Sequence, residues 1–292
     1  ALSSWFSSSA LLPQLKTVFG VGDESISLLT VAVNCGFMVG ATASSIFLLA
    51  DRFNPRKLFC TGAMTAAGCN ALMLVVGSME SPSFVAGFLL RFVNGMAYAF
   101  VYPCAMKIAS AWFVEDRGLA FGTVLGTLTV GSALPSLVIA FGGLSWRQVI
   151  TTTSIMVVVG GLLPVVFMRD GPHSTEPVPF SLKQLPILMR NRELMLAIGA
   201  YTMHNWELYG MWAWYSDFAE DALLGSENIS TEQAREDGHL IGFFAVASGC
   251  ILCVIAGTAA DRYGRTLICI MSLAASATCS LFAGMATTRA AL

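Results

Sequence analysis

Charged residues are scarce in this sequence. Asp, Glu, Lys and Arg together make up 12% of the 292 residues, whereas roughly 25% is usual in a soluble domain. Apolar residues make up 55%, so there is too little polar surface to cover a water-exposed globule. The formal net charge of −2, without any block of Lys or Arg, gives no sign of a nucleic-acid partner. The composition therefore predicts an integral membrane protein.

Motifs of several enzyme classes are missing as well. The sequence has no HExxH helix, no GxSxG nucleophile elbow and no phosphate-binding loop ending in Gly-Lys-Ser/Thr. Its eight cysteines lie within apolar runs, and Cys250-x-x-Cys253 has no companion His or second pair. We interpret that pair as small-residue packing in a helix. We therefore expect no enzyme activity, no cofactor, no metal site and no disulfide.

Apolar runs long enough to cross a membrane recur along the whole chain. A helix of about 18 or more such residues spans roughly 30 Å of hydrocarbon. The opening run has no positively charged leader and does not resemble a signal peptide, so we expect the chain to begin inside a helix. The nine predicted spans are approximately 1–19, 27–50, 58–77, 83–110, 119–141, 147–168, 193–216, 238–260 and 266–287.

The basic residues predict how these spans are oriented, because cytoplasmic loops carry an excess of Lys and Arg. If successive spans alternate in direction, 11 of the 16 basic residues fall on one side. We assign that side to the cytoplasm. The 11 residues are Arg52, Arg56, Lys57, Lys107, Arg117, Arg169, Lys183, Arg190, Arg192, Arg262 and Arg265.

Two acid–base loops indicate an internal repeat. The loop Ala50-Asp51-Arg52 follows the second span, and Ala260-Asp261-Arg262 follows the eighth. The stretch SWFSSSALLPQL of the first span can also be aligned with NWELYGMWAWYS of the seventh, and Trp5 then corresponds to Trp206. Many transporters are built from such repeats, with the substrate site between them near the middle of the bilayer.

The repeat predicts three segments. Residues 1–168 form an N-terminal six-helix transmembrane bundle, and residues 169–192 form a cytoplasmic linker. The apolar and basic second half of this linker predicts a short interfacial helix. Residues 193–292 form a partial C-terminal transmembrane bundle, which about three further helices would complete.

Small residues spaced four apart mark two predicted packing faces. Gly36, Gly40 and Ser44 share one face of the second span, and Gly118, Gly122 and Gly126 share one face of the fifth. Such rows let helices approach closely in lipid. We interpret these glycines as structural.

These features resemble the major facilitator superfamily over essentially the whole chain. The loop signature of that family reads Gly-x-x-x-Asp-Arg-x-Gly-Arg-(Arg/Lys), and residues 257–265 match it closely. The first copy departs from it, because Phe47 replaces the leading Gly and Asn54-Pro55 replaces Gly-Arg. The resemblance implies an all-α integral membrane fold with a complete N-terminal six-helix bundle and about three helices of the C-terminal bundle.

Other stretches bear on the branch of the family. The family has a second signature in its fourth span, an Arg followed by Gln-Gly, and Arg91-Phe92-Val93-Asn94-Gly95 is similar to it. The antiporters of the family have a signature in the fifth span, a Gly-Pro followed by paired glycines, and residues 131–135 match it poorly. Residues 112–122 and 204–214 look like the branch of anion or carboxylate porters. The resemblance also implies that the loop charges form a cytoplasmic latch between the bundles. The residues assigned to this latch are Asp51, Arg52, Arg117, Asp261, Arg262 and Arg265.

Arg91 is the sharpest single candidate for solute recognition. An arginine near a helix centre costs about 2.5–3.5 kcal/mol on insertion scales and persists mainly where it faces a bundle interior or a watery cavity. One hypothesis makes it an anion anchor or a proton-coupling partner. The alternative is a structural residue that hydrogen-bonds neighbouring helices.

His204 and Glu207 are the candidates for proton coupling. They lie three apart and so share one face of the seventh span. A His near neutral pH and a Glu in a low dielectric could accept and release a proton during transport. The alternative places Glu207 in water at the outer interface.

Several aromatic and amide residues complete the candidate site. Trp206 and Tyr209 could line the cavity, whereas Trp212, Trp214 and Tyr215 are typical of an aromatic belt. Asn94 and Tyr98 are buried polar candidates in the fourth span, although contacts between helices would also explain them.

Together these predictions describe an alternating-access secondary transporter of a small solute, with an anion or carboxylate favoured and proton coupling as a hypothesis. Its expected partners are that solute, the lipid bilayer and protons, and we expect a monomer. Two alternatives stay open, a drug or metabolite efflux transporter and a membrane sensor that binds solute without moving it. An acid in the first-half cavity would favour efflux, and none is found within the first six spans.

Overall fold

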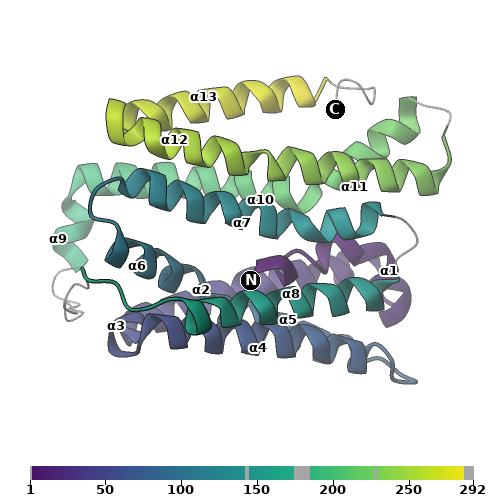
Figure 1. Ribbon diagram of the computed structural model, residues 1–292. Coiled ribbons are helices and arrows are strands. Elements are labelled where there is room, and N and C mark those ends of the chain that lie inside the picture. Colours follow the sequence, from purple (N-terminus) through teal and green to yellow (C-terminus); the bar gives the residue numbers. More distant parts are fainter. Residues whose placement is uncertain (1, 142–144, 174–184, 227–228, 286–292) are drawn as a thin grey trace.

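The computed structural model describes residues 2–141, 145–173, 185–226 and 229–285. Within these ranges the chain is helical and contains no β-strand. Most of the helices lie side by side along one common direction (Figure 1). This arrangement is the one expected when every backbone polar group in a bilayer must be paired within its own helix.

The first half of the chain contains the helices up to residue 167. Four of them are 22 to 24 residues long, and the fourth predicted span is divided in two. The bounds are α1 Leu12–Phe19, α2 Asp23–Ile46, α3 Leu49–Arg52, α4 Pro55–Val76, α5 Phe84–Tyr98, α6 Tyr102–Trp112, α7 Arg117–Ala140 and α8 Trp146–Phe167. Asn54 caps α4, because its side chain accepts hydrogen bonds from the backbone N–H groups of Arg56 and Lys57.

The first predicted span is not one continuous helix. Residues 2–4 and 9–11 form short 3₁₀ turns, η1 and η2, and the α-helix begins only at Leu12. Five serines stand between residues 3 and 9, and Ser side chains compete with the helix for backbone hydrogen bonds. The expectation that the chain begins inside a regular helix is therefore wrong for the described residues, and the opening segment leaves carbonyl groups available to other helices.

The second half contains four long helices, and a short helix precedes them. The bounds are α9 Leu185–Arg190, α10 Arg192–Ser226, α11 Thr231–Ala247, α12 Gly249–Tyr263 and α13 Arg265–Ala283. Helix α9 occupies the position predicted for the interfacial helix of the linker, whereas residues 174–184 lie outside the described residues. Neither α12 nor α13 contains a buried residue.

Seven helical stretches of the described chain are long and apolar enough to cross a membrane. They are α2, α4, α5 with α6, α7, α8, α11 with α12, and α13. The first predicted span is excluded because its α-helix has only 8 residues. Helix α10 does not meet this standard either, although its 35 residues extend over about 52 Å at 1.5 Å per residue.

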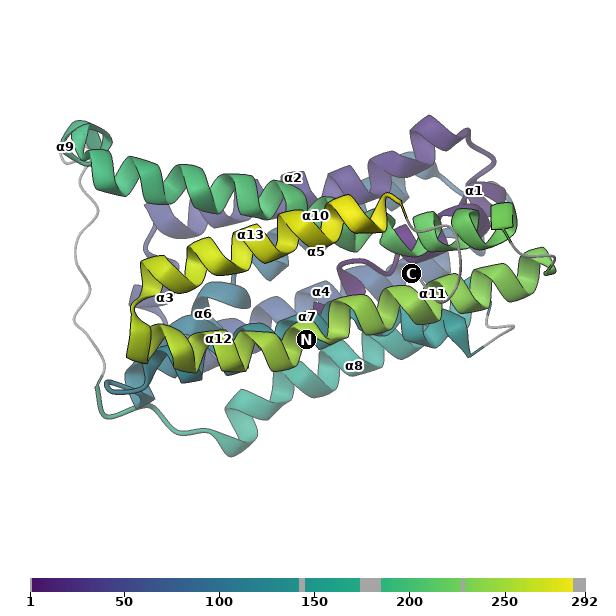
Figure 2. The same ribbon diagram turned by 90° about the horizontal axis from the view of Figure 1, so that it is seen from above.

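The two halves meet along α7. This helix packs against α12 near residue 118 and against α11 farther along, and α10 lies beside α11 (Figures 1 and 2). The predicted glycine row faces this contact: a Cβ atom at Gly118 would lie 2.2 Å from the Gly257 carbonyl oxygen, and one at Gly122 would lie 2.4 Å from that of Cys253. We call this contact the α7–α12 seam. Only glycine allows backbones to approach this closely.

The same approach accounts for the Cys250-x-x-Cys253 pair. A Cβ atom at Gly126 would meet the carbonyl oxygen of Cys250 at 2.7 Å, so both cysteines lie opposite glycines of α7. Both carry free thiols. The two cysteines thus lie one helical turn apart on α12, opposite two successive glycines of the row on α7.

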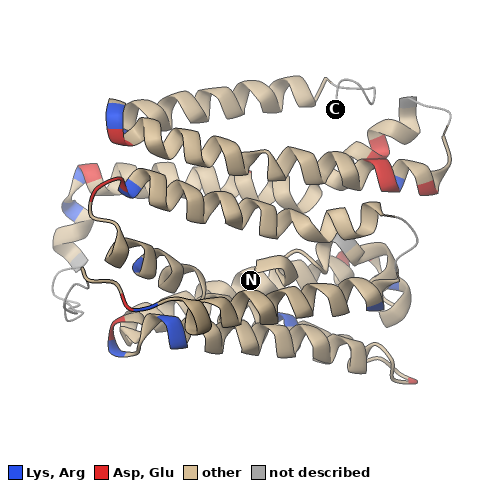
Figure 3. Ribbon diagram, viewed as in Figure 1, with Lys and Arg blue, Asp and Glu red and all other residues tan. Residues whose placement is uncertain are grey.

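Charged residues gather at the two ends of the helices and are sparse between them (Figure 3). The ends at α3, α9 and the turn between α12 and α13 carry most of the basic residues, and we assign them to the cytoplasm. At this end Arg56 binds Asp170 of the linker, with 2.8 Å between Nε and Oδ1. This hydrogen bond and a second one from Asn54 hold the pKa of Asp170 below its usual range.

Candidate functional site

Arg91 lies on α5 and reaches into the broken opening segment. Its side chain is 1% exposed. Nη1 donates to the carbonyl oxygen of Ser4 at 3.0 Å and to Oδ1 of Asn70 at 3.2 Å, and Nη2 donates to the carbonyl oxygen of Trp5 at 2.6 Å. The guanidinium therefore binds carbonyl groups that a regular α-helix would have paired within itself.

Asn94 and Tyr98 extend this contact along α5. Asn94 Nδ2 donates to the carbonyl oxygen of Ala66 at 2.8 Å and to Ser4 Oγ at 3.3 Å, and the Tyr98 hydroxyl lies 2.5 Å from the same Ser4 oxygen. Arg91, Asn94 and Tyr98 follow one another at helical spacing, so they share a face of α5. We call these residues with Ser4 and Trp5 the Arg91 cluster. They tie the opening segment to the middle of the first half.

Three buried polar atoms of the Arg91 cluster have no hydrogen-bond partner among the residues that the structure describes. They are Arg91 Nε, Trp5 Nε1 and Asn94 Oδ1. Buried polar groups normally have a partner, so each such atom is a candidate to bind a ligand or water. The structure thus shows both a structural use of Arg91 and unused hydrogen-bonding capacity beside it.

The aromatic residues of α10 divide into two groups. Tyr209 stacks on Trp5 with 5.9 Å between ring centroids, and Trp212 lies edge-on to Phe6 at 5.7 Å. Trp206 is 85% exposed and lies away from them. Tyr209 therefore joins α10 to the opening segment of the first half, whereas Trp206 makes no ring contact with the described residues there. Trp212, predicted as an interfacial anchor, belongs to this contact instead.

Glu207 lies in the middle of α10 and is half-buried. Ser276 Oγ and Ser280 Oγ of α13 donate to its Oε1 at 2.6 and 3.4 Å. It follows the start of α10 by 15 residues, or about 22 Å along the axis, so it lies away from either end. His204 is exposed on the same helix. The structure places both residues toward α13 and not in the Arg91 cluster.

The two acid–base loops make different contacts. Asp51 pairs with Lys107 of α6, and Lys107 also donates to the carbonyl oxygen of Ala50 at 2.8 Å. All of these groups belong to the first half. Asp261 instead crosses to the other half, because its Oδ2 accepts from the backbone N–H of Gly118 at 2.8 Å and of Leu119 at 3.3 Å.

Asp261 thus sits at the N-terminus of α7, where unpaired N–H groups and the helix dipole favour an anion. Arg117 donates to the carbonyl oxygen of Phe113 in its own segment. Arg52, Arg262 and Arg265 are exposed, and no ion pair to them is found among the described residues. Of the six residues assigned to the latch, Asp261 is the one that the structure brings to the opposite half at its cytoplasmic end.

A pocket opens at the opposite, outer end between the halves. Phe6 and Ser132 line it from the first half, and Trp212, Asp217 and His239 line it from the second. Ser136 of α7 and Ser216 of α10 meet there, with 3.3 Å between their hydroxyl oxygens. The contact between α7 and the second half is therefore closed by Asp261 of α12 at one end and opens into a pocket between α7, α10 and α11 at the other.

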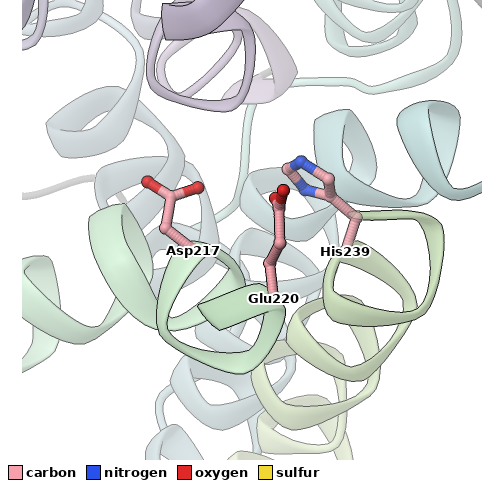
Figure 4. Close-up of side chains that lie close together, drawn as sticks. All are labelled: Asp217, Glu220 and His239. Carbon is pink, nitrogen blue, oxygen red and sulfur yellow. The ribbon is translucent and has the colours of Figure 1, made fainter. Parts of the chain in front are cut away.

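Asp217, Glu220 and His239 form a polar cluster beside this pocket that the sequence analysis missed (Figure 4). We call it the His239 cluster. Its members come from two helices that are joined by an acidic stretch: seven of the 18 acidic residues of the chain lie between 217 and 237, with Arg235 as the one basic residue there. This excess of acid at the end of a span, followed by a histidine, is the signal that could have revealed the cluster.

Comparison with known proteins agrees with this architecture. The family model described as the Major Facilitator Superfamily matches residues 1–292, so the chain belongs to that superfamily. It is an integral, multi-pass membrane protein, as the sequence predicted, and its family points to a transporter.

Two curated relatives are similar to the chain. The glycerol-3-phosphate transporter of Bacillus subtilis (strain 168) is 22% identical over 269 residues, which cover 85% of this chain and 59% of that protein. The agnestins efflux protein AgnL12 of Paecilomyces divaricatus is 25% identical over 170 residues, which cover 56% of this chain and 37% of that protein. The chain therefore spans less than two thirds of the length of these relatives. No solved structure matches the chain.

Proposed function

We propose that the protein is a secondary active transporter that moves a small anionic solute across the membrane by alternating access. The observation that carries this proposal is the contact of α7 with the second half, which Asp261 of α12 closes at the cytoplasmic end and which opens into a pocket between α7, α10 and α11 at the other end. A close contact of glycines allows two bundles to rock against each other without large side chains having to repack.

The anionic substrate class rests on two further points. One relative is named as a transporter of glycerol-3-phosphate, which is an anion. In addition, the Arg91 cluster combines a buried guanidinium with unused N–H groups on Arg91 and Trp5. An oxyanion that reached these groups when the opening segment shifts would accept charge-assisted hydrogen bonds. Asn94, Tyr98 and Tyr209 line the same region and would orient the solute.

Proton coupling is part of the proposal, and Glu207 with His204 would carry it on α10. Two serine hydroxyls of α13 donate to the Glu207 carboxylate, and protonation of Glu207 would weaken this contact with α13. Such a change could bias the packing of α10 during the transport cycle.

The test is uptake of labelled small anions, glycerol-3-phosphate among them, into proteoliposomes that contain the full-length protein, with and without an inward proton gradient. We expect saturable uptake that the gradient increases. Glu207→Gln should abolish the increase in uptake but keep solute binding. Glu193→Gln, at the start of the same helix, should keep both. Equal stimulation in the wild type and in Glu207→Gln would show that Glu207 does not couple protons.

The second candidate function is efflux of a larger organic molecule, which the similarity to the agnestins efflux protein favours. The aromatic contacts among Trp5, Phe6 and Tyr209 would suit an apolar solute. The same proteoliposomes, loaded with a fluorescent aromatic solute, separate the two functions. Export of that solute together with no uptake of any anion would favour efflux.

A further inference from the structure

We propose that Asp217, Glu220 and His239 form a binding site for a divalent transition-metal cation at the outer ends of α10 and α11. One carboxylate oxygen from each acid and one ring nitrogen of the histidine all lie within 4.8 Å of one another. In Figure 4 the Glu220 carboxylate and the imidazole point toward one another, with Asp217 one helical turn away from Glu220. This site goes beyond the proposed transport function and does not depend on it.

The state of His239 is the observation that points to a ligand. The residue is 2% exposed, and its Nδ1 has no hydrogen-bond partner in the described part of the chain. A buried imidazole normally uses both ring nitrogens, because an unpaired polar atom away from water costs free energy. A metal ion coordinated by this ring would remove that cost.

The backbone is arranged so that the two helices meet at this cluster. A Cβ atom at Gly238 would lie 2.7 Å from the backbone nitrogen of Glu220, and one at Gly242 would lie 2.1 Å from Ser216 Oγ. Glycines on either side of His239 in α11 therefore let it approach α10 closely. The cluster results from helix packing at a fixed contact and not from flexible surface side chains.

The charge of the site matches a divalent ion. Asp221 and Arg235 lie within electrostatic range of both acids. Three carboxylates and one guanidinium leave two negative charges in excess, and a neutral His239 adds none. No ion pair from Arg235 to these acids is found among the described residues, and its Nη2 has no hydrogen-bond partner there. Arg235 thus does not occupy the position between the ligands.

One imidazole and two carboxylates are a typical ligand set for Zn²⁺ and similar ions. Ligands of a tetrahedral Zn²⁺ ion are about 3.3 Å apart at the usual bond lengths, so modest side-chain rotations of Asp217 and Glu220 would bring them into place. Asp217 and His239 also line the outer pocket, which leaves room for a water molecule as a fourth ligand. Hard ions such as Mg²⁺ prefer oxygen ligands throughout.

The experiment measures Zn²⁺ binding to the full-length protein, purified with a tag that contains no histidine and placed in nanodiscs of uncharged lipid. Competition with a chromophoric chelator gives the stoichiometry and the affinity. We expect one Zn²⁺ per chain, and at least a roughly ten-fold weaker affinity in His239→Gln, Glu220→Gln and Asp217→Asn.

Two matched variants serve as controls. His204→Gln removes an exposed histidine from α10, and Glu232→Gln removes an exposed acid from α11; both should bind Zn²⁺ as the wild type does. The proposal would be overturned if the wild type showed no saturable Zn²⁺ binding, or if His239→Gln bound Zn²⁺ with unchanged affinity.

A second readout needs no variant and covers the case in which a ligand substitution impairs folding. Co²⁺ added to the wild type should give the visible absorption bands of a four- or five-coordinate ion, and Zn²⁺ but not Mg²⁺ should displace it. Thermal unfolding of the wild type should also shift upward with Zn²⁺. Failure of both the bands and the shift would overturn the proposal, whatever the variants do.

Discussion

The Arg91 cluster and the His239 cluster are both buried polar groups, but they use their hydrogen-bonding capacity differently. Arg91 makes bonds from both terminal nitrogens to the opening segment and to Asn70. His239 is equally buried, yet its Nδ1 has no partner in the described part of the chain. The Arg91 cluster thus holds segments of the protein together and keeps a few polar atoms unused beside those bonds, whereas Nδ1 of His239 takes part in no hydrogen bond of this kind within the described residues.

The same contrast applies to the two acid–base loops. Asp51 pairs with Lys107 inside the first half, and Asp261 binds the N-terminus of α7 across the seam. Related sequences at matching places in a repeat thus perform different tasks, because the neighbours that surround them differ. The following predictions test this contrast, from the largest expected effect to the smallest.

Removing the guanidinium should have the largest effect on stability. Arg91→Ala leaves the Trp5 carbonyl oxygen without its donor, and it leaves the Ser4 carbonyl oxygen and Asn70 Oδ1 to share the single hydroxyl of Ser7. We therefore expect a loss of about 3 kcal/mol or more. Thermal unfolding in detergent measures it. Arg117→Ala is the control, since Arg117 is exposed and binds within its own segment. If both variants unfold at the wild-type temperature, Arg91 does not hold the opening segment.

A methyl group in the seam should have a smaller effect. Gly122→Ala forces its Cβ against the Cys253 carbonyl oxygen, and overpacking of this kind costs about 1–3 kcal/mol. Gly131→Ala is a matched control on the same helix, because nothing lies within 4 Å of its Cβ position. We expect slower uptake and a lower unfolding temperature for Gly122→Ala alone. If the two variants had the same uptake rate and the same unfolding temperature, α7 and α12 could move apart without loss of stability or function.

The smallest effect is expected at Asp261. Asp261→Asn weakens a charge–dipole contact worth about 0.3–1 kcal/mol at an exposed helix end, which corresponds to a two- to five-fold shift in a two-state equilibrium. The measurement is labelling of a cysteine at Ser132, in the outer pocket, by an impermeant thiol reagent in a background without native cysteines. Labelling should slow in Asp261→Asn and stay unchanged in Asp51→Asn. Identical labelling rates in the wild type and in Asp261→Asn would show that Asp261 does not act as a latch.

Sequence reasoning found the membrane class, most of the spans and the linker helix because each depends on local composition. Helix α9 and the spans from α2 to α8 lie where their apolar runs predicted them. The first span was wrong in detail, because its serines and the donors on α5 act against a regular helix. The domain boundaries and the roles of the site residues stay predictions.

The candidate site was harder to predict. Arg91, Asn94 and Tyr98 could be placed on one face of a helix from their spacing, but the partners of that face lie in the opening segment, more than 80 residues away in sequence. The exposure of Trp206 could not be predicted, because an alignment between repeats does not determine the rotation of α10 about its axis. Tyr209, three residues on, makes the contact with Trp5 instead.

The sequence by itself determined that this protein lies in a membrane, because hydrophobicity along a helix-length segment is sufficient for that. It also determined the repeated loops and, through its family resemblance, the class of transporter. Only the tertiary structure decided which loop acid reaches the other half and which histidine lacks a partner. Those properties depend on contacts between distant segments, and close helix approach at Gly118, Gly122 and Gly238 sets these contacts.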